Sequence, residues 1–378
     1  MKLEEKRIWL SPPHMGGNEL QYIQEAFDTN WISQAGNNIT EFEKSLENYL
    51  GKNSFVTALS SGTAAIHLAL QLLNVEEGDF VICQSFTFVA SANPILYLKA
   101  VPVFVDSERS TWNLCPDALD EAIKFCIKKG KKPKAIIVVS LYGMPFMVKE
   151  IIAISRRYEI PIIEDSAEAL GSRYENQLCG TFGDLSVISF NGNKIITTSG
   201  GGILISRNQK DKNRTFYLAT QAKEDKDYYS HSEIGYNYRL NNISAGIGRG
   251  QMQVLEERIL QRRKNHDFYQ GVLNDSEVFS LFSAPDEKYY SNYWLNTIII
   301  KHPDLQKEEI AKQFSEKNIE TRYLWKPMHL QDLYKDYYFF GTNVCGMLFD
   351  TGLCLPSGSE MSDRCRCRIS ELLSGIKI

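Results

Sequence analysis

Short apolar runs alternate with segments of helical periodicity between residues 60 and 205, and this alternation restricts the chain to few folds. The apolar runs predict strands over 80–83, 101–105, 135–140, 161–164, 185–190 and 202–205. The intervening segments predict helices over 63–73, 88–98, 117–128 and 147–158, after an earlier helix over 39–50. Strands without a polar face must be covered on both sides, so the pattern predicts an α/β domain around a parallel or mixed sheet.

The pattern changes after residue 240. One long helix is predicted over 244–273, and then a strand over 293–300, a helix over 305–317, a short strand over 319–323 and a helix over 362–373. The long helix suits a connector, and the roughly 100 residues after it suit a small α+β domain. We therefore expect a large α/β domain over 1–243, and a connecting helix with a smaller domain over 244–378.

Composition excludes several classes of protein. A net charge of -4 gives no general attraction for nucleic acid, and the charged start of the chain does not resemble a signal peptide. No apolar run reaches the roughly 20 residues that span a bilayer. The eight cysteines form no Cys-x-x-Cys pair and the six histidines are isolated. We expect a cytoplasmic protein with free thiols, no metal site, and neither a nucleic-acid nor a membrane partner.

Two polar segments at predicted strand ends have the chemistry to bind a ligand. Ser60-Ser61-Gly62-Thr63 starts the predicted helix over 63–73, where backbone N–H groups attract a phosphate. Asp165 ends the strand over 161–164, where a carboxylate can keep a heterocyclic nitrogen protonated. Each segment taken alone is better explained as an ordinary helix cap.

Two further segments follow the strand over 185–190. The turn after it carries Lys194, which could form a Schiff base, although a lone lysine is usually a surface residue. Residues 200–202 are three glycines, which either bend the chain around a ligand or make a tight turn. A phosphate cradle, an acid and a lysine in this order match the three groups that hold pyridoxal phosphate (PLP).

The chain also resembles a known family through several motifs. The chain contains NWIS over 30–33, SGTAA over 61–65, TFVA over 87–90, EDSAE over 164–168, Ser189-Phe190 with Lys194, TSGGG over 198–202 and GYNYR over 235–239. These motifs are similar to those of the DegT/DnrJ/EryC1/StrS sugar aminotransferases, which are fold-type I PLP enzymes. The resemblance covers nearly the whole chain and implies a large mixed, mostly parallel sheet with a smaller C-terminal α+β domain.

The resemblance implies a role for each cofactor-binding residue. Lys194 would carry PLP as a Schiff base and act as the proton carrier, and Asp165 would pair with the ring nitrogen. Gly62, Thr63 and Ser189 would bind the phosphate. Phe88 would stack on the ring, and Glu168, where many relatives have Gln, would lie near the ring hydroxyl. Asn237 would reach the phosphate of a neighbouring subunit, which implies a homodimer with shared active sites.

The resemblance also suggests a substrate. NWI over 30–32, KPMH over 326–329 and LPSG over 355–358 are similar to the branch acting at C4 of nucleotide-linked 4-keto-6-deoxy sugars. L-glutamate would be the amino donor, and a UDP-linked N-acetyl sugar, as in bacillosamine-like surface glycans, is the first candidate. GDP-perosamine-type and dTDP-linked substrates, with C3 or C4 amination, are the alternatives. Four residues are candidate substrate contacts: Trp31, Arg239, Tyr323 and His329, the last of which could instead pack at the domain junction.

Three other functions compete with transamination. The first is a lysine-bearing relative that runs another PLP reaction, such as a dehydration. A branch of the same family that performs dehydration replaces the lysine with histidine, whereas this chain keeps Lys194, which favours transamination. A non-catalytic regulatory protein of this fold should have lost Asp165 or Lys194, or gained a DNA-binding domain. A Rossmann dehydrogenase should carry an early Gly-x-Gly-x-x-Gly after a strand, and the sequence has none.

Overall fold

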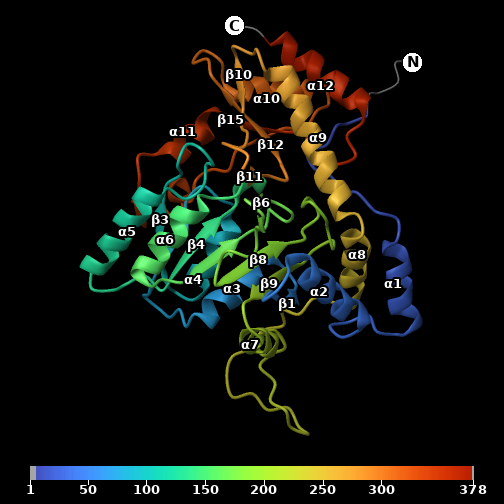
Figure 1. Cartoon of the computed structure of the whole chain (residues 1–378), viewed down its shortest axis with the longest axis vertical. Coiled ribbons are helices and arrows are strands. Elements are labelled where there is room, and N and C mark those ends of the chain that lie inside the picture. The colour runs from blue at the N-terminus through green and yellow to red at the C-terminus, as the bar shows by residue number, and fades with distance from the viewer. Residues whose placement is uncertain (1–5, 377–378) are drawn as a thin grey trace.

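An eight-stranded sheet forms the centre of the large part of the molecule (Figure 1). In spatial order its strands are β1 (Phe55–Leu59), β9 (Gly202–Ser206), β8 (Leu185–Ser189), β5 (Ile162–Asp165), β4 (Ala135–Val139), β2 (Phe80–Gln84), β3 (Val101–Val105) and β14 (Tyr338–Phe340). In this computed structural model, which describes residues 6–376, β9 is antiparallel to both of its neighbours and the other neighbouring pairs are parallel. The carboxyl ends of β1, β2, β4, β5 and β8 therefore meet at one edge.

Helices cover both faces of this sheet. On one face lie α3 (Gly62–Leu72), α4 (Asn93–Tyr97) and α7 (Gln209–Ala219), and on the other lie α5 (Pro116–Lys128) and α6 (Val148–Tyr158). Strand β2 shows why both faces must be covered. Val81 and Cys83 pack into the hydrophobic core under α3, α4 and α7, and Ile82 packs into the core under α5 and α6. Every residue of β4 is buried, as expected for a central parallel strand.

A second sheet of four antiparallel strands forms the smaller part of the molecule. Its order is β10 (Phe279–Leu281), β12 (Asn296–Ile300), β15 (Gly352–Leu355) and β13 (Arg322–Tyr323), with α10 (Lys307–Glu316), α11 (Val344–Thr351) and α12 (Asp363–Gly375) nearby. Figure 1 shows α9 (Leu255–Leu273) extending from α8 (Asn242–Met252) up to this sheet. The short strands β11 (Tyr289–Tyr290), β6 (Arg173–Tyr174) and β7 (Gln177–Leu178) form a third sheet between the two.

Two N-terminal helices and three 3-10 turns complete the described elements. Helices α1 (Glu19–Asp28) and α2 (Asn37–Leu50) both pack against α8. The 3-10 turns are η1 (Val89–Ser91), η2 (Leu141–Gly143) and η3 (Met328–Leu330). Among residues 6–376, no helix combines the length and apolar character needed to cross a bilayer. All eight cysteines lie in the described residues and are free.

The predicted fold class is confirmed, but several predicted elements were wrong in detail. The helix predicted over 244–273 is two helices, because the backbone of Val254 leaves the helical region at φ -113°. The helix predicted over 88–98 divides into η1 and α4, with Pro94 in the first turn of α4. The strand predicted over 319–323 shortens to β13. The elements that were not predicted include α1, β1, α7, α11 and β15.

The division at residue 243/244 stays a prediction. One strand from beyond that position, β14, pairs in parallel with β3 and thereby extends the large sheet. The two parts of the chain are thus joined by α9 and also by this edge strand.

Candidate active site

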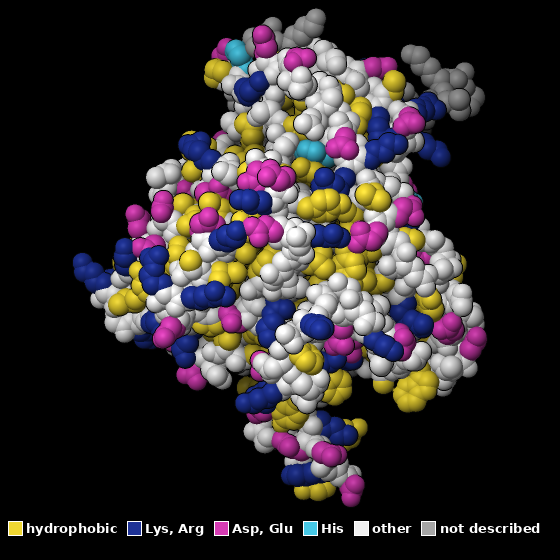
Figure 2. Space-filling model, in the orientation of Figure 1, with side chains coloured by type: hydrophobic (Ala, Val, Ile, Leu, Met, Phe, Trp, Pro, Cys, Tyr) yellow, Lys and Arg dark blue, Asp and Glu magenta, His cyan; other side chains and the backbone are white. Residues whose placement is uncertain are grey.

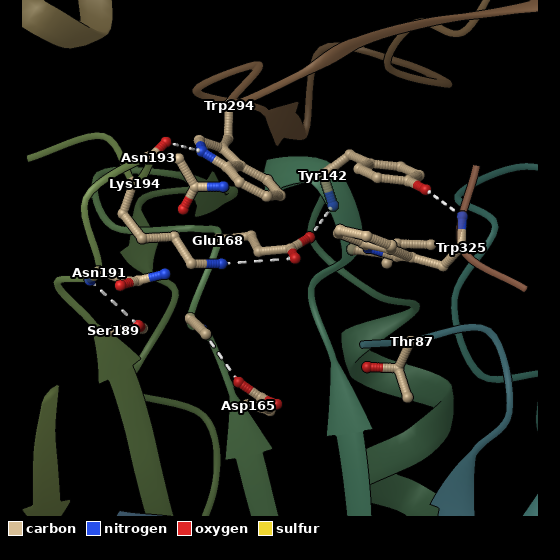
Figure 3. Close-up of polar contacts among 12 residues, drawn as sticks. Thr87, Tyr142, Asp165, Glu168, Ser189, Asn191, Asn193, Lys194, Trp294 and Trp325 are labelled. Carbon is tan, nitrogen blue, oxygen red and sulfur yellow. Dashed lines mark hydrogen bonds and ion pairs between the residues drawn. The ribbon is translucent and has the colours of Figure 1, made fainter. Parts of the chain in front are cut away.

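A cavity of about 370 Å³ opens at the carboxyl edge of the large sheet. Open α/β sheets bind their ligands at this edge. Seven of the twelve residues proposed from sequence line the cavity: Gly62, Thr63, Phe88, Asp165, Glu168, Ser189 and Lys194. Figure 3 shows Lys194, Glu168, Asp165 and Ser189 pointing toward one space from neighbouring strand ends. The fold therefore brings together residues that lie up to 132 positions apart in the sequence.

The start of α3 forms the end of the cavity that is suited to bind an anion. Ser61 caps this helix, because its hydroxyl oxygen accepts a hydrogen bond of 3.0 Å from the N–H of Ala64. The N–H groups of Gly62 and Thr63, in the first turn, have no acceptor inside the helix. Ser189 lies beside them, since a Cβ built on Gly62 would be 3.3 Å from the Cβ of Ser189. This arrangement suits a phosphate.

The carboxylate of Asp165 lies at the end of β5 and is almost completely buried. The hydroxyl of Ser91 donates to its Oδ2 at 2.7 Å, and the N–H of Ala167 donates to its Oδ1 at 3.1 Å. Burial raises the pKa of this carboxyl, and the two hydrogen bonds partly offset that effect. A cationic nitrogen placed against Asp165 would favour the ionised carboxylate.

Lys194 extends from the turn after β8 toward Glu168. Its Nζ lies 3.5 Å from Oε1 of Glu168, and 12% of the lysine side chain is exposed. The N–H of Tyr142 donates to Oε2 of Glu168 at 2.7 Å. Burial raises the pKa of the Glu168 carboxyl, while Lys194 opposes this shift. The amine also lies 4.1 Å from the centroid of the Trp294 ring, so it is held between a carboxylate and an aromatic face.

An aromatic wall, of which only Phe88 was predicted from the sequence, lines part of the cavity. Trp294 and Trp325 line the cavity, and Phe88 packs against Trp325 with ring centroids 5.3 Å apart. Tyr142 stacks behind both tryptophans, at 6.5 Å from Trp294 and 6.2 Å from Trp325. The wall comes from elements far apart in the sequence, so no local pattern could have indicated it. The hydroxyl contact of Ser91 to Asp165 was missed for the same reason.

Two of the proposed substrate contacts, Arg239 and His329, make structural contacts within this chain. Arg239 is buried in an ion pair with Glu43, and it donates to the carbonyl oxygen of Ala58 at 3.1 Å. Its guanidinium is therefore not available to the cavity. His329 stacks on Phe339 at 3.7 Å, with its Nδ1 2.8 Å from Oγ of Ser85, which favours packing at the junction over substrate contact.

The other three proposed residues lie on separate surfaces. Tyr323 lines a neighbouring hollow of about 640 Å³, which shares Asn193, Trp294 and Trp325 with the cavity. Trp31 is exposed in a different hollow near α1. Asn237 is exposed on the segment after α7, where its side-chain oxygen accepts a hydrogen bond of 3.0 Å from Gln221. Within this single chain, none of the three reaches the cavity.

Comparison with known proteins agrees with this geometry. The sequence model of the DegT/DnrJ/EryC1/StrS aminotransferase family matches residues 13–373. The chain belongs to this family. EpsN of Bacillus subtilis is 48% identical over 97% of this chain and 95% of its own length. A GDP-perosamine synthase of Escherichia coli O157:H7 is 36% identical over 88% of each chain.

Solved structures extend the comparison to the fold. A DegT DnrJ EryC1 StrS aminotransferase from Brucella abortus superimposes with a TM-score of 0.88 at 28% identity, covering 95% of each chain. Spr1654 of Streptococcus pneumoniae, solved in a PLP form, superimposes with a TM-score of 0.87 at 25% identity over 97% of each chain. Other relatives of about 30% identity are named as aminotransferases of a UDP-linked and of a dTDP-linked sugar. The protein is a PLP-dependent sugar aminotransferase.

The cavity fits the cofactor. The α3 N-terminus suits its phosphate, the buried Asp165 suits its pyridine nitrogen, and Lys194 lies between the two and can reach an aldehyde. PLP supplies an electron-accepting ring that stabilises negative charge on an adjacent carbon.

Proposed function

We propose that the protein transfers an amino group from L-glutamate to C4 of a nucleotide-linked 4-keto-6-deoxy sugar, for surface-glycan or related amino-sugar biosynthesis. The observation that carries this proposal is the convergence of Lys194, Asp165 and Glu168 on one cavity beside a second, larger hollow. The cavity suits the cofactor and the reacting carbon. The adjoining hollow leaves room for the remainder of a substrate much larger than a keto acid.

Each residue then has a definite task. Nζ of Lys194 would hold the cofactor covalently and, when free, would act first as the base and then as the acid that moves a proton at the donor carbon. Asp165 holds the ring nitrogen in its protonated state. Gly62, Thr63 and Ser189 hold the phosphate, and Glu168 orients the amine. Trp294 covers the amine with an apolar face that excludes water.

The identity of the nucleotide has two main candidates. A UDP-linked N-acetyl sugar is the first, in line with the relative named for such a substrate. GDP-linked perosamine precursors come next, and they are supported by the perosamine synthase above, which is 36% identical to this chain, against 30% for the UDP-sugar relative. A dTDP-linked sugar, aminated at C3 or C4, is the third. The expected cytoplasmic location stays a prediction.

Asn237 lies outside the cavity of its own chain, which supports a dimer with shared active sites. The chain between α7 and Asn237 extends away from the body of the molecule below α7 (Figure 1), and Asn237 lies at the base of this segment, paired with Thr220. The exposed side chains of Tyr228, Tyr229 and Ile234 on this segment offer apolar surface to a second subunit. In such a dimer, Asn237 would complete the phosphate site of the partner.

A panel of enzymatically generated UDP-, GDP- and dTDP-linked 4-keto-6-deoxy sugars tests the proposal. Each sugar is incubated with the PLP-loaded protein and ¹⁵N-glutamate, and the product is analysed by mass spectrometry and NMR. We expect one nucleotide class to acquire ¹⁵N at C4. Label at C3, or in no member of the panel, would contradict the substrate assignment. Absence of spectral conversion with glutamate alone would contradict transamination and favour dehydration.

A further inference from the structure

Arg262 is a buried guanidinium without an acidic partner. It lies in α9 with 1% of its surface exposed, and no carboxylate among residues 6–376 lies within ion-pair distance of it. Burying a charge in this way is costly unless hydrogen bonds compensate for the lost water. Burial lowers the pKa of the Arg262 guanidinium to about 9, which still leaves it charged at neutral pH.

Four separate segments of the chain supply the acceptors for Arg262. Its Nη1 donates to the carbonyl oxygens of Trp294 at 2.6 Å and of Ser357 at 3.2 Å. Its Nη2 donates to Oγ of Ser11 at 2.9 Å and, at 3.5 Å, to the carbonyl oxygen of Lys194. A planar guanidinium can hold several acceptors in fixed directions, whereas the lysine ammonium is a point charge on a flexible stem.

Two of these partners also hold the backbone next to Lys194. The hydroxyl of Ser11 donates to the carbonyl oxygen of Asn193 at 2.7 Å. Nε1 of Trp294 donates to the same oxygen at 2.7 Å, as the dashed line in Figure 3 shows. The carbonyl oxygens of two consecutive residues, Asn193 and Lys194, are thus fixed by one network centred on Arg262. The same network fixes the ring of Trp294, which lies against the amine.

We propose that Arg262 is a positioning residue for the reaction, which acts through Ser11 and Trp294 to direct the amine of Lys194 into the cavity beside Glu168. The inference rests on the proposed role of Lys194. It makes the N-terminal segment at Ser11 part of the catalytic apparatus, although Ser11 lies far from Lys194 in the sequence. Small displacements of a reacting group lower rates strongly, so this network is expected to affect rate more than substrate binding.

The test compares Arg262→Lys with the matched control Arg258→Lys. Arg258 lies one turn earlier in α9, is 4% exposed, and donates to the carbonyl oxygen of Met15 at 3.0 Å. It therefore tethers the N-terminal segment without contacting the turn that carries Lys194. Three properties are measured for each variant: thermal unfolding without cofactor, PLP affinity from the absorbance of the lysine-bound form, and the single-turnover rate with glutamate.

For Arg262→Lys we expect a single-turnover rate lowered by about tenfold to 100-fold, with little change in KM for glutamate. PLP affinity and the rate of borohydride reduction at Lys194 should also fall. Arg258→Lys should lower the unfolding temperature while keeping the wild-type rate. A wild-type rate in Arg262→Lys, or equal rate losses in both variants, would overturn the proposal.

Ser11→Ala provides a milder variant if Arg262→Lys does not fold. It removes the hydroxyl that links Arg262 to the carbonyl oxygen of Asn193. We expect the single-turnover rate to fall severalfold. In the double variant the two losses should be less than multiplicative, because both substitutions break one network. An unchanged rate in Ser11→Ala, or fully multiplicative losses, would contradict the network. Covalent cofactor retained in Lys194→Ala would instead contradict the proposed role of Lys194.

Discussion

Asp165 and Glu168 are two buried carboxyls whose pKa values are raised mainly by burial. An acid with a raised pKa in the folded state keeps its proton longer than in the unfolded chain. The contribution of these two carboxyls to the free energy of unfolding of the cofactor-free protein is therefore fully present below the ordinary carboxyl pKa of about 4, and it is lost as pH rises through the raised pKa values. Ionisation of these two carboxyls lowers the free energy of unfolding, and a bound cofactor with a cationic ring nitrogen would offset this loss.

Asp165→Asn should separate stability from function. The amide cannot ionise, so the cofactor-free variant should unfold at a higher temperature than the wild type at pH 7, and the difference should vanish near pH 4. With PLP, activity should fall on the order of 100-fold or more, because the ring nitrogen loses its countercharge. Differential scanning calorimetry over this pH range measures the first effect. The exposed control Asp225→Asn should change neither property, and a pH-independent loss of stability in Asp165→Asn would contradict this account.

Arg239→Met should destabilise the fold without changing substrate binding. Removing one partner of a buried ion pair leaves the other uncompensated, here Glu43, at a cost of about 3–5 kcal/mol. Denaturant titration should show this loss, and adding Glu43→Gln should recover part of it. A raised KM for the sugar in folded Arg239→Met protein would instead support the substrate contact that its sequence motif suggested.

At the residue scale, local motifs could identify only part of the site. Lys194, Asp165 and Gly62 could be predicted, because each sits at a strand end or helix start whose local sequence is distinctive. Trp294 and Trp325 could not, since their approach to Lys194 depends on how the small sheet packs on the large one. The ion pair of Arg239 could not be predicted, because a motif does not reveal which buried acid, here Glu43, will face it.

At the element scale, the contact between α3 and β9 shapes the phosphate end of the cavity. Gly202 begins β9, and a Cβ built on it would lie 2.5 Å from the backbone nitrogen of Gly62. The obstructing atoms are backbone, so they cannot rotate away. Glycine at this position is what allows the start of α3 to lie against the sheet.

Gly202→Ala should therefore weaken PLP binding by displacing the start of α3. We expect a loss of about 1–3 kcal/mol in stability and a PLP affinity lowered at least tenfold, measured by absorbance titration. Gly271→Ala, in α9, is the matched control, because its Cβ would meet open space. Equal PLP affinity in Gly202→Ala and the wild type would show that the α3 start does not hold the phosphate.

Helices and strands could be predicted where the hydrophobic pattern determines their bounds. They could be predicted less well where tertiary contacts determine those bounds. The strands over 80–83 and 101–105 were predicted to within one residue, since their residues are buried on both faces. The break at Val254 in the helix over 244–273 was not predicted, because it depends on tertiary packing. Helix α8 packs against α1 and α2, whereas α9 packs against the small sheet. Strand β1 was missed because its five residues carry no strong alternation.

At the scale of the whole molecule, charge does not gather into one patch on the face that Figure 2 shows. Figure 2 shows basic and acidic side chains interspersed over the visible surface, with apolar side chains between them. Dimer formation should therefore depend on shape and apolar contact more than on long-range attraction.

Shared active sites predict complementation between subunits. Lys194→Ala and Asn237→Asp should each be impaired, the second because an acid would face the partner's phosphate. After unfolding and refolding together, up to about a quarter of the sites should be intact, because half of all dimers are mixed and each mixed dimer carries one complete site out of two. Mixing Lys194→Ala with Asp165→Asn should restore nothing, since both residues belong to one subunit's cavity. No recovery in the first mixture would contradict the role of Asn237.

The covalent role of Lys194 can be measured directly. The protein is loaded with PLP, reduced with borohydride, digested and mapped by mass spectrometry. We predict a phosphopyridoxyl group on the peptide that contains Lys194, and none in Lys194→Ala. The group on another lysine, or an unmodified Lys194 in protein that has bound PLP, would contradict the account.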